Sequence, residues 1–352
     1  MSKIPKTGTK TIVAEGLLSP LAGRITTIIE SARGRVQTVV NQEMVCAYWE
    51  IGREIVEEEQ RGEKRAEYGK TLIENLSKEL TGRYGKGFTA SNLLTMRRFY
   101  QTYPIQHAVR AELSWTHYRL LLKVDDVQKR SFYEIECVNN NWSTRELDRQ
   151  MNSMLFERLA LSRDKEGVMT LASKGQVLQT PSDMVKDPYV LEFLGLPQSE
   201  RLYEKELESA LIDHLQQFIL ELGKGFSFVA RQKRITLDGE HFFIDLVFYN
   251  YILKCFVLID LKIGKLAHQD IGQIQMYVNY YTREMMNEGD NPPIGILLCD
   301  TKSDAVVQYT LPEGNNQIFA SRYKLYLPTE EELRAELVRD REFIERERRL
   351  RE

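Results

Sequence analysis

Three apolar runs rich in β-branched residues, all in the rear part of the chain, most constrain its fold. Each has the length and composition of a strand, and turn-forming residues separate them; the runs are 226–237, 242–249 and 255–263. The segments on either side, 206–222 and 267–288, have the apolar spacing of helices. A shorter apolar run at 294–299 adds a strand, and 324–327 is a further candidate. The predicted order is α-β-β-β-α-β.

A carboxylate interrupts two of these strands. Along 242–249 the side chains alternate between two faces, and both faces are apolar except at Asp245. The next strand ends in Asp260 and Lys262, which are two residues apart and therefore point to the same face. A carboxylate is costly to bury unless it is paired or binds a metal. If the two strands pair as a hairpin, Asp245, Asp260 and Lys262 meet at one edge of the sheet.

Two carboxylates and an amine suit the hydrolysis of a phosphodiester bond. Carboxylate oxygens are ligands that Mg²⁺ prefers, and the bound ion stabilises the negative charge that develops on the phosphate. Mn²⁺ is expected to substitute for Mg²⁺. Lys262 can position the attacking water, accept its proton if the pKa of the lysine is lowered, or offset charge in the transition state. The sequence thus predicts a metal-dependent site with Asp245, Asp260 and Lys262 as catalytic residues.

The neighbouring helices add candidates. Glu208 lies on the buried stripe of the 206–222 helix, so its carboxylate is predicted to reach the site as a further catalytic group and metal ligand; Glu204 fits the same face but lies at the start of the helix. On the following helix, Gln273 and Tyr277 lie one turn apart and can present an amide and a hydroxyl. Taken singly, such short signals usually mark solvated strand ends or salt-bridge partners. Their occurrence along one α-β-β-β-α-β path favours a site.

The front part of the chain has a different period. From residue 20 to about 160, apolar residues recur at steps of three and four, which predicts helices only. Residues 1–150 hold 23 Lys and Arg against 19 Asp and Glu, whereas residues 151–352 hold 25 against 32. This asymmetry is consistent with contact between residues 1–150 and phosphate groups, and with acidic metal ligands in residues 151–352. At 352 residues the chain is too long for one core. We predict a helical domain at 14–162, a linker at 163–186, an α/β domain at 187–328 and a charged helical tail at 329–352.

Basic side chains in both parts are candidates for nucleic-acid contact. Residues 68–103 have the pattern of a helix–turn–helix, and the basic residues on or near its second helix would contact phosphates: Arg83, Lys86, Arg97 and Arg98. An ordinary helical hairpin with a solvated basic face explains the pattern equally well, because the turn is long. In the rear domain, Arg234 on the first strand is a further candidate phosphate contact. It shares a face with Gln232, which could line the cleft.

At these residues the chain resembles a known group of proteins. The segments LESALIDHLQQFILELGKGFSFVARQKRI, FIDLVFYN and VLIDLKIGKL resemble the PD-(D/E)xK nuclease superfamily and, within it, the bacterial YhcG-like family. The segments YGKTLIENLSKELTGRYGKGFTASNLLTMRRFYQTYP and LSWTHYRLLLKVDD resemble the helical N-terminal domain of that family. The resemblance covers nearly the whole chain except the first dozen or so residues and the Glu/Arg-rich tail. It implies a restriction-endonuclease-like fold and a Mg²⁺-dependent nuclease associated with DNA processing or defence.

The resemblance also implies a role for each site residue. Asp245 corresponds to the first acidic residue of the motif, Asp260 to the second, Lys262 to the lysine and Glu208 to the acid on the helix. Asp260 stands where the commonest pattern has Glu. The expected function is hydrolysis of DNA in repair, recombination or defence. Two alternatives stay open: an inactive nuclease-fold protein that binds DNA or assembles a complex, and a structural subunit recruited through the tail.

The remaining expectations concern partners and location. DNA is the expected partner and RNA stays open, while the helical domain or the tail is expected to offer a surface for a homo-oligomer or a protein partner. No apolar run approaches the roughly 20 residues that a membrane span needs, and the N-terminus lacks the apolar block of a signal peptide. The four cysteines lie far apart and form no C-x-x-C pair. A cytoplasmic protein is expected.

Overall fold

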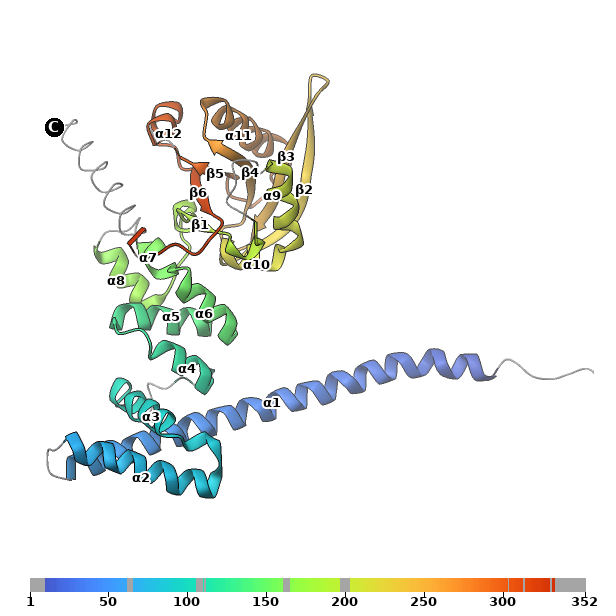
Figure 1. Ribbon diagram of the computed structural model, residues 1–352. Coiled ribbons are helices and arrows are strands. Elements are labelled where there is room, and N and C mark those ends of the chain that lie inside the picture. The colour runs from blue at the N-terminus through green and yellow to red at the C-terminus, as the bar shows by residue number, and fades with distance from the viewer. Residues whose placement is uncertain are drawn as a thin grey trace, which may run out of the picture. The chain divides into compact units, whose positions relative to one another are not determined.

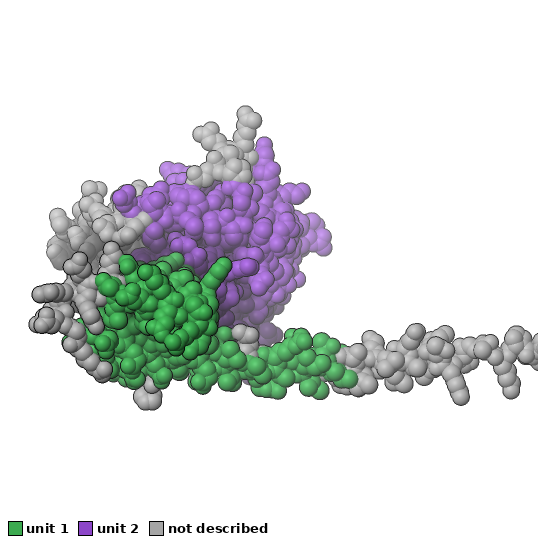
Figure 2. Space-filling view, turned by 60° about the horizontal axis from the view of Figure 1, so that its bottom comes forward, with its two compact units in different colours: residues 1–125 green, residues 126–352 purple. Residues whose placement is uncertain are grey.

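The computed structural model describes residues 10–61, 66–105, 110, 112–160, 165–196, 203–302, 304–312, 314–329 and 331–332. The chain divides into two compact units, Met1–Asp125 and Asp126–Glu352, which Figure 2 colours separately. Figure 1 labels their helices and strands. None of the described helices is both long enough and apolar enough to cross a membrane. The predicted tail at 329–352 lies almost entirely outside the described residues.

The described part of the first unit is helical, as predicted. Its elements are α1 (Lys10–Arg61), α2 (Ala66–Tyr84), the short 3₁₀ helix η1 (Lys86–Phe88), α3 (Ala90–Thr102) and α4 (Trp115–Leu121). The C-terminal part of α1 crosses α3 closely at Gly52, where an added Cβ would collide with the carbonyl oxygen of Met96. Ile55, Met96 and Leu93 are buried in the core that α1, α2 and α3 share. Thr89 caps α3 by accepting a hydrogen bond from the backbone of Asn92.

The second unit begins with four helices. They are α5 (Val127–Asn139), α6 (Thr144–Asn152), α7 (Leu155–Ala160) and α8 (Lys165–Lys174). The compact units divide after Asp125, so these helices share a compact unit with the sheet, while the predicted end of the helical domain at 162 stays a prediction. Residues 165–174, expected in a linker, form α8, which packs against α5. The glycines and polar residues of 163–186 indicated a loop, but tertiary packing overrides that composition.

Among the described residues, six strands form one mixed sheet in the order β1-β6-β5-β4-β3-β2. The strands are β1 (Tyr189–Val190), β2 (Phe226–Leu237), β3 (Glu240–Asn250), β4 (Cys255–Lys265), β5 (Ile294–Thr301) and β6 (Ile318–Lys324). β2, β3 and β4 are antiparallel neighbours, and the other neighbours are parallel. The last strand was predicted at 324–327, but β6 ends at Lys324. β1 was not predicted because two residues are too few for a periodic pattern.

Helices cover both faces of the sheet (Figure 1). On one face lie α9 (Glu204–Asp213) and α10 (Leu215–Leu222), which pack Leu211 and Phe218 against Phe248 of β3. The predicted 206–222 helix is thus two helices, with a break at His214. On the other face lies α11 (His268–Tyr280), which packs Ile274 against Leu258 of β4. The second unit also contains the short 3₁₀ helices η3 (Pro181–Asp183) and η4 (Glu192–Leu194), a π-helical turn, η5 (Tyr281–Met285), and α12 (Asp304–Thr310).

Candidate active site

The predicted site lies where β3 and β4 stop pairing. The last pair of their ladder is Leu246 opposite Ile259, so the next residues along the two strands are Asp245 and Asp260. Beyond the ladder, the Oδ2 atom of Asp245 accepts a hydrogen bond from the backbone N–H of Leu261 at 2.8 Å. The side chain thus takes over the role of a backbone acceptor. This register brings the two predicted acids together.

The alternation of side chains along β3 slips at Asp245. A strict period of two predicts that Ile244 and Leu246 lie on one face, but Ile244 packs in the core on the α11 side and Leu246 in the core on the α9 side. That prediction is wrong. On the neighbouring β2, Gln232 has a φ of 47° in the left-handed region, where a non-glycine residue is strained by on the order of 1–3 kcal/mol. The strained backbone of Gln232 and the slip at Asp245 lie side by side, and residues held in this way cluster at functional sites.

Gln232 connects two acids from different elements. Its Nε2 donates to Oε2 of Glu208 on α9 at 2.8 Å and to Oδ1 of Asp245 at 2.9 Å. Arg231 completes the arrangement, because its Nε donates to Oε1 of Glu208 at 2.6 Å. Glu208 is only 5% exposed, and protein donors contact both of its oxygens. It therefore reaches Asp245 through the amide of Gln232.

Asp260 and Lys262 form the other half of the site. Oδ2 of Asp260 lies 3.0 Å from Nζ of Lys262. Asp260 is buried, with 1% of its surface exposed. The two charges form an ion pair, yet none of the described residues donates a well-directed hydrogen bond to Oδ2. Burial and the neighbouring Asp245 together raise the pKa of Asp260 to about 7. Burial also raises the pKa of Asp245. A buried carboxylate, Asp260, and a half-buried one, Asp245, therefore stand side by side and are short of positive charge.

Glu204 is an acid of the site that the sequence analysis set aside. It lies one helical turn before Glu208 on α9, and its Oε1 accepts from the backbone N–H of Ile263 at 3.3 Å. Burial by itself would lower the pKa of Lys262, but Asp260 and Glu204 outweigh burial and the pKa is raised. The spacing of the two glutamates was a usable signal. Arg231 was missed as well, although it begins the basic run of β2.

Gln273 and Tyr277 support the strand that carries Asp245. Nε2 of Gln273 donates to the hydroxyl of Tyr277 at 2.5 Å, and that hydroxyl donates to the backbone carbonyl of Phe243 at 3.0 Å. Burial raises the pKa of Tyr277, and Asp260 and Asp245 add to the rise. The hydroxyl therefore stays protonated and can donate. The pair holds β3 two residues before Asp245.

The chemistry of the side chains in this site suits a divalent cation. Asp245 and Asp260 offer carboxylate oxygens, which Mg²⁺ and Mn²⁺ accept as ligands. The buried Oδ2 of Asp260, to which the protein directs no hydrogen-bond donor, is an atom that a cation would satisfy. Within the described ranges, no three His, Cys, Asp or Glu side chains stand close enough to hold an ion. The three predicted metal ligands, Asp245, Asp260 and Glu208, do not come together around one point, since Glu208 accepts hydrogen bonds from Gln232 and Arg231.

The basic residues predicted to contact DNA lie on both units. In the first unit three arginines have acidic partners: Arg83 with Glu79 at 3.0 Å, Arg97 with Glu59 at 2.8 Å and Arg98 with Asp125 at 2.7 Å. Lys86 is exposed in η1. The pairs of Arg83 and Arg98 are exposed and contribute little energy, so phosphate could replace their acids, whereas the pair of Arg97 is partly buried. In the second unit, Arg234 is exposed on the edge strand β2. The nucleic-acid role of all five stays a prediction.

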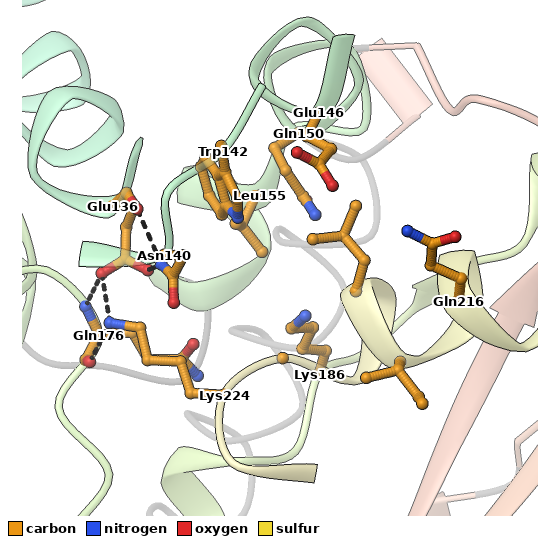
Figure 3. A pocket seen from close by; sticks show the side chains of 13 residues that line it. Glu136, Asn140, Trp142, Glu146, Gln150, Leu155, Gln176, Lys186, Gln216 and Lys224 are labelled. Atoms are coloured by element: carbon orange, nitrogen blue, oxygen red, sulfur yellow. Dashed lines mark hydrogen bonds and ion pairs between the residues drawn. The ribbon is translucent and has the colours of Figure 1, made fainter. Parts of the chain in front are cut away.

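The second unit also holds a pocket that is separate from these carboxylates. Figure 3 shows it between α5, α6, α10 and the chain at Gln176 and Lys186, with a volume of about 250 Å³. Gln150 lines it fully buried, and neither end of its side-chain amide has a hydrogen-bond partner. Burial lowers the pKa of Lys186 to about 8. Neither Asp245 nor Asp260 lines this pocket, so it is not the predicted site.

Known proteins are similar to this chain along most of its length. Residues 182–338 match the family model of the YhcG PDDEXK nuclease domain, and residues 24–158 match that of the DUF1016 N-terminal domain. "Putative nuclease YhcG" of Escherichia coli (strain K12) is 39% identical over 350 residues, which cover 90% of this chain and 93% of that protein.

Two solved structures are similar to a smaller part of the chain. A repair endonuclease from Pyrococcus abyssi is 21% identical with a TM-score of 0.25, and the match covers 37% of this chain and 50% of that one. The EndoMS–dsDNA2 complex is 17% identical with a TM-score of 0.26, and the match covers 38% of this chain and 50% of that one. The residues of the candidate site, from Glu204 to Tyr277, all lie inside the range that the nuclease-domain family model matches.

Proposed function

Because the chain belongs to the YhcG family and carries its PDDEXK nuclease domain, we propose that it is a metal-dependent nuclease that hydrolyses phosphodiester bonds of DNA. Family membership confirms the resemblance and the fold that the sequence indicated. One observation supports the activity most directly: Asp245 and Asp260 stand side by side on neighbouring strands, with Lys262 next to Asp260. An inactive descendant would be expected to have lost one of these groups.

The two aspartates would hold the cation. Mg²⁺, or Mn²⁺ in its place, would supply a Lewis acid that stabilises negative charge on the phosphate. The carboxylate of Asp245 is oriented by Leu261 and Gln232, so its position is set by the fold. The carboxylate of Asp260 is held less tightly, by Lys262 alone on its Oδ2 atom.

Lys262 would act as a fixed positive charge beside the reacting phosphate. Its ammonium can donate to the attacking water or to a phosphate oxygen, and both interactions strengthen as negative charge develops. Gln232 positions Asp245, and Glu208 positions Gln232 in turn, through hydrogen bonds of 2.9 Å and 2.8 Å. Tyr277 also positions Asp245 indirectly, because its hydroxyl donates to the backbone carbonyl of Phe243 on the same strand.

The edge strand β2 supports DNA as the substrate. Arg231, Lys233 and Arg234 are exposed on it, next to the strand that carries Asp245. Basic side chains along one strand can contact successive phosphates, and such contacts hold a backbone without reading its sequence. Repair, recombination and defence against foreign DNA are the processes that such an enzyme would serve.

Nuclease assays test the proposal. Purified protein is incubated with labelled linear, nicked, branched and single-stranded DNA, and with RNA, in Mg²⁺ or Mn²⁺ and in EDTA. We expect cleavage of DNA that EDTA stops and that Lys262→Ala abolishes. Lys265→Ala is the matched control, because Lys265 is exposed at the end of the same strand. If no substrate is cut, or if Lys262→Ala cuts as fast as the unchanged protein, the proposed activity is rejected.

A further inference from the structure

Helix α1 presents an apolar surface beyond the part that packs in the first unit. Large aliphatic side chains between residues 25 and 44 are 40% to 66% exposed: Ile25, Ile28, Ile29, Val36, Val39, Val40 and Met44. Farther along the same helix, Val45 and Trp49 are 2% and 5% exposed. Figure 1 shows the N-terminal half of α1 extending past α2, α3 and α4 of its own unit. We call the seven exposed residues the α1 stripe.

The α1 stripe lies on one side of the helix. With 3.6 residues per turn, its seven side chains fall within an arc of roughly 160°. Val45, Trp49 and Val56, which are buried in the first unit, point to the opposite side, roughly 180° from the centre of that arc. Ile51 and Ile55, which pack in the core of the first unit, lie at one edge of the same arc, so the stripe continues part of the packed face beyond α2, α3 and α4 (Figure 1). Another apolar surface has to cover it.

The sequence of this part of α1 is unfavourable for a helix alone in water. Nine of the twenty residues from Ile25 to Met44 are β-branched, and Gly34 lies among them. β-branched residues cost up to roughly 0.7 kcal/mol each relative to Ala in a helix, and Gly costs about 1 kcal/mol. Helices in proteins obtain most of their stability from the packing of an apolar face. The helical state of residues 25–44 thus depends on a partner for the stripe.

The spacing of the stripe identifies another helix of the same kind as that partner. Ile25, Ile29, Ala32, Val36 and Val39 follow each other at steps of four, three, four and three, which is the spacing of a coiled-coil seam. The branched side chains act as knobs and Ala32 leaves room for a close approach. Two copies of the segment offer each other the same knobs and holes, so the surface is complementary to itself.

Area and charge are consistent with pairing of two copies. From their exposed fractions, the seven side chains of two helices would bury on the order of 1,000 Å² in total, the size at which specific interfaces begin. The charged residues from Ile25 to Met44 are Glu30, Arg33, Arg35 and Glu43, two of each sign. The segment therefore carries no net charge that would keep two copies apart.

We propose that residues 25–44 of α1 form a coiled coil with the same residues of a second copy of the chain, which makes the protein a homodimer. The coiled coil lies in the first unit and is independent of the nuclease chemistry. The dimer carries two copies of the candidate active site.

The mass of the full-length protein in solution tests this proposal. Light scattering and sedimentation should give twice the chain mass of 41.1 kDa. The double variant Ile29→Lys, Val36→Lys places charge in the seam and should give the mass of one chain. Thr27→Lys, Ser31→Lys is the matched control: both positions are exposed and lie roughly 180° and 140° around the helix from the centre of the stripe, and it should stay dimeric. Because all four positions lie outside the buried core, circular dichroism should show the other helices unchanged.

Three results would overturn the proposal. The first is a wild-type protein that stays monomeric at every concentration. The second is a stripe variant that stays dimeric while its circular dichroism matches wild type, since the interface then lies elsewhere. The third is a monomeric wild type that sediments with vesicles of anionic phospholipid while the stripe variant does not, because the stripe then faces a membrane surface.

Discussion

Two buried carboxylates of the second unit have opposite surroundings. Glu221 on α10 is fully buried, and burial by itself would raise its pKa, but Arg158, Lys186 and Arg149 outweigh burial and lower the pKa to about 2. Asp260 on β4 is nearly as buried, yet its pKa rises to about 7. The fold surrounds the first carboxylate with cations and leaves the second beside another acid.

Hydrogen bonds show the same difference. Oε1 of Glu221 lies 2.5 Å from Arg158 and accepts from the backbone of Val190 at 3.0 Å, while Oε2 lies 3.2 Å from Arg149. These bonds connect α6, α7, α10 and β1, and they explain why the helices after Asp125 belong with the sheet. Within the part of the chain that the structure describes, Asp260 has no comparable set of donors. A saturated carboxylate holds the fold together, whereas an unsaturated one is suited to a ligand.

Removing the charge of Glu221 should have the largest effect on stability. Glu221→Gln leaves the wholly buried Arg158 without its counter-charge, and breaking a buried pair from one side costs about 3–5 kcal/mol. Chemical denaturation measures the loss. Glu240→Gln on the exposed start of β3 is the control and should change the free energy of unfolding little. An equal, small effect of both variants would show that Glu221 does not hold the helices to the sheet.

Removing the charge of Asp260 should instead affect activity. Asp260→Asn keeps the shape of the side chain but removes a proposed metal ligand and the ion-pair partner of Lys262, so we expect the cleavage rate to fall by about 100-fold or more. The free energy of unfolding should stay within about 1 kcal/mol of the wild-type value or rise, because the variant no longer buries a negative charge beside Asp245. Initial rates and denaturation are measured on the same preparation. If Asp260→Asn unfolds as easily as Glu221→Gln, the contrast between the two carboxylates is lost.

Acid should weaken the protein partly through Glu221. Its folded pKa of about 2 lies below the ordinary value of 4.5, so its contribution to stability is complete above pH 4.5 and is lost as the pH falls toward 2. At about pH 3.5 the loss from this group should be about 1 kcal/mol. Denaturation is measured for wild type and Glu221→Gln at each pH over this range. The difference between their free energies of unfolding should shrink by that amount. A difference that stays constant would mean that Glu221 does not titrate as described.

Much of the candidate site could be predicted from local patterns. Asp245 was identified because a carboxylate in an apolar strand requires a reason, and Asp260 and Lys262 because a spacing of two puts them on one face. Glu208 followed from the stripe of its helix. Each argument uses residues within one element, whose spacing depends on the backbone geometry of that element alone. The helical front part was predictable for the same reason.

Contacts between elements decided the rest. The slip of β3 at Asp245 depends on the backbone of Gln232 on another strand, and no periodic pattern carries that information. The ion pair that brings α7 into the second unit joins Arg158 to Glu221, 63 residues later in the chain. Glu208 was predicted to be a metal ligand, but in the structure it accepts hydrogen bonds from Arg231 and Gln232 of another element. Sequence by itself determined which side chains need a partner, and only the tertiary structure decided which partner each one has, because that depends on groups far apart in the chain.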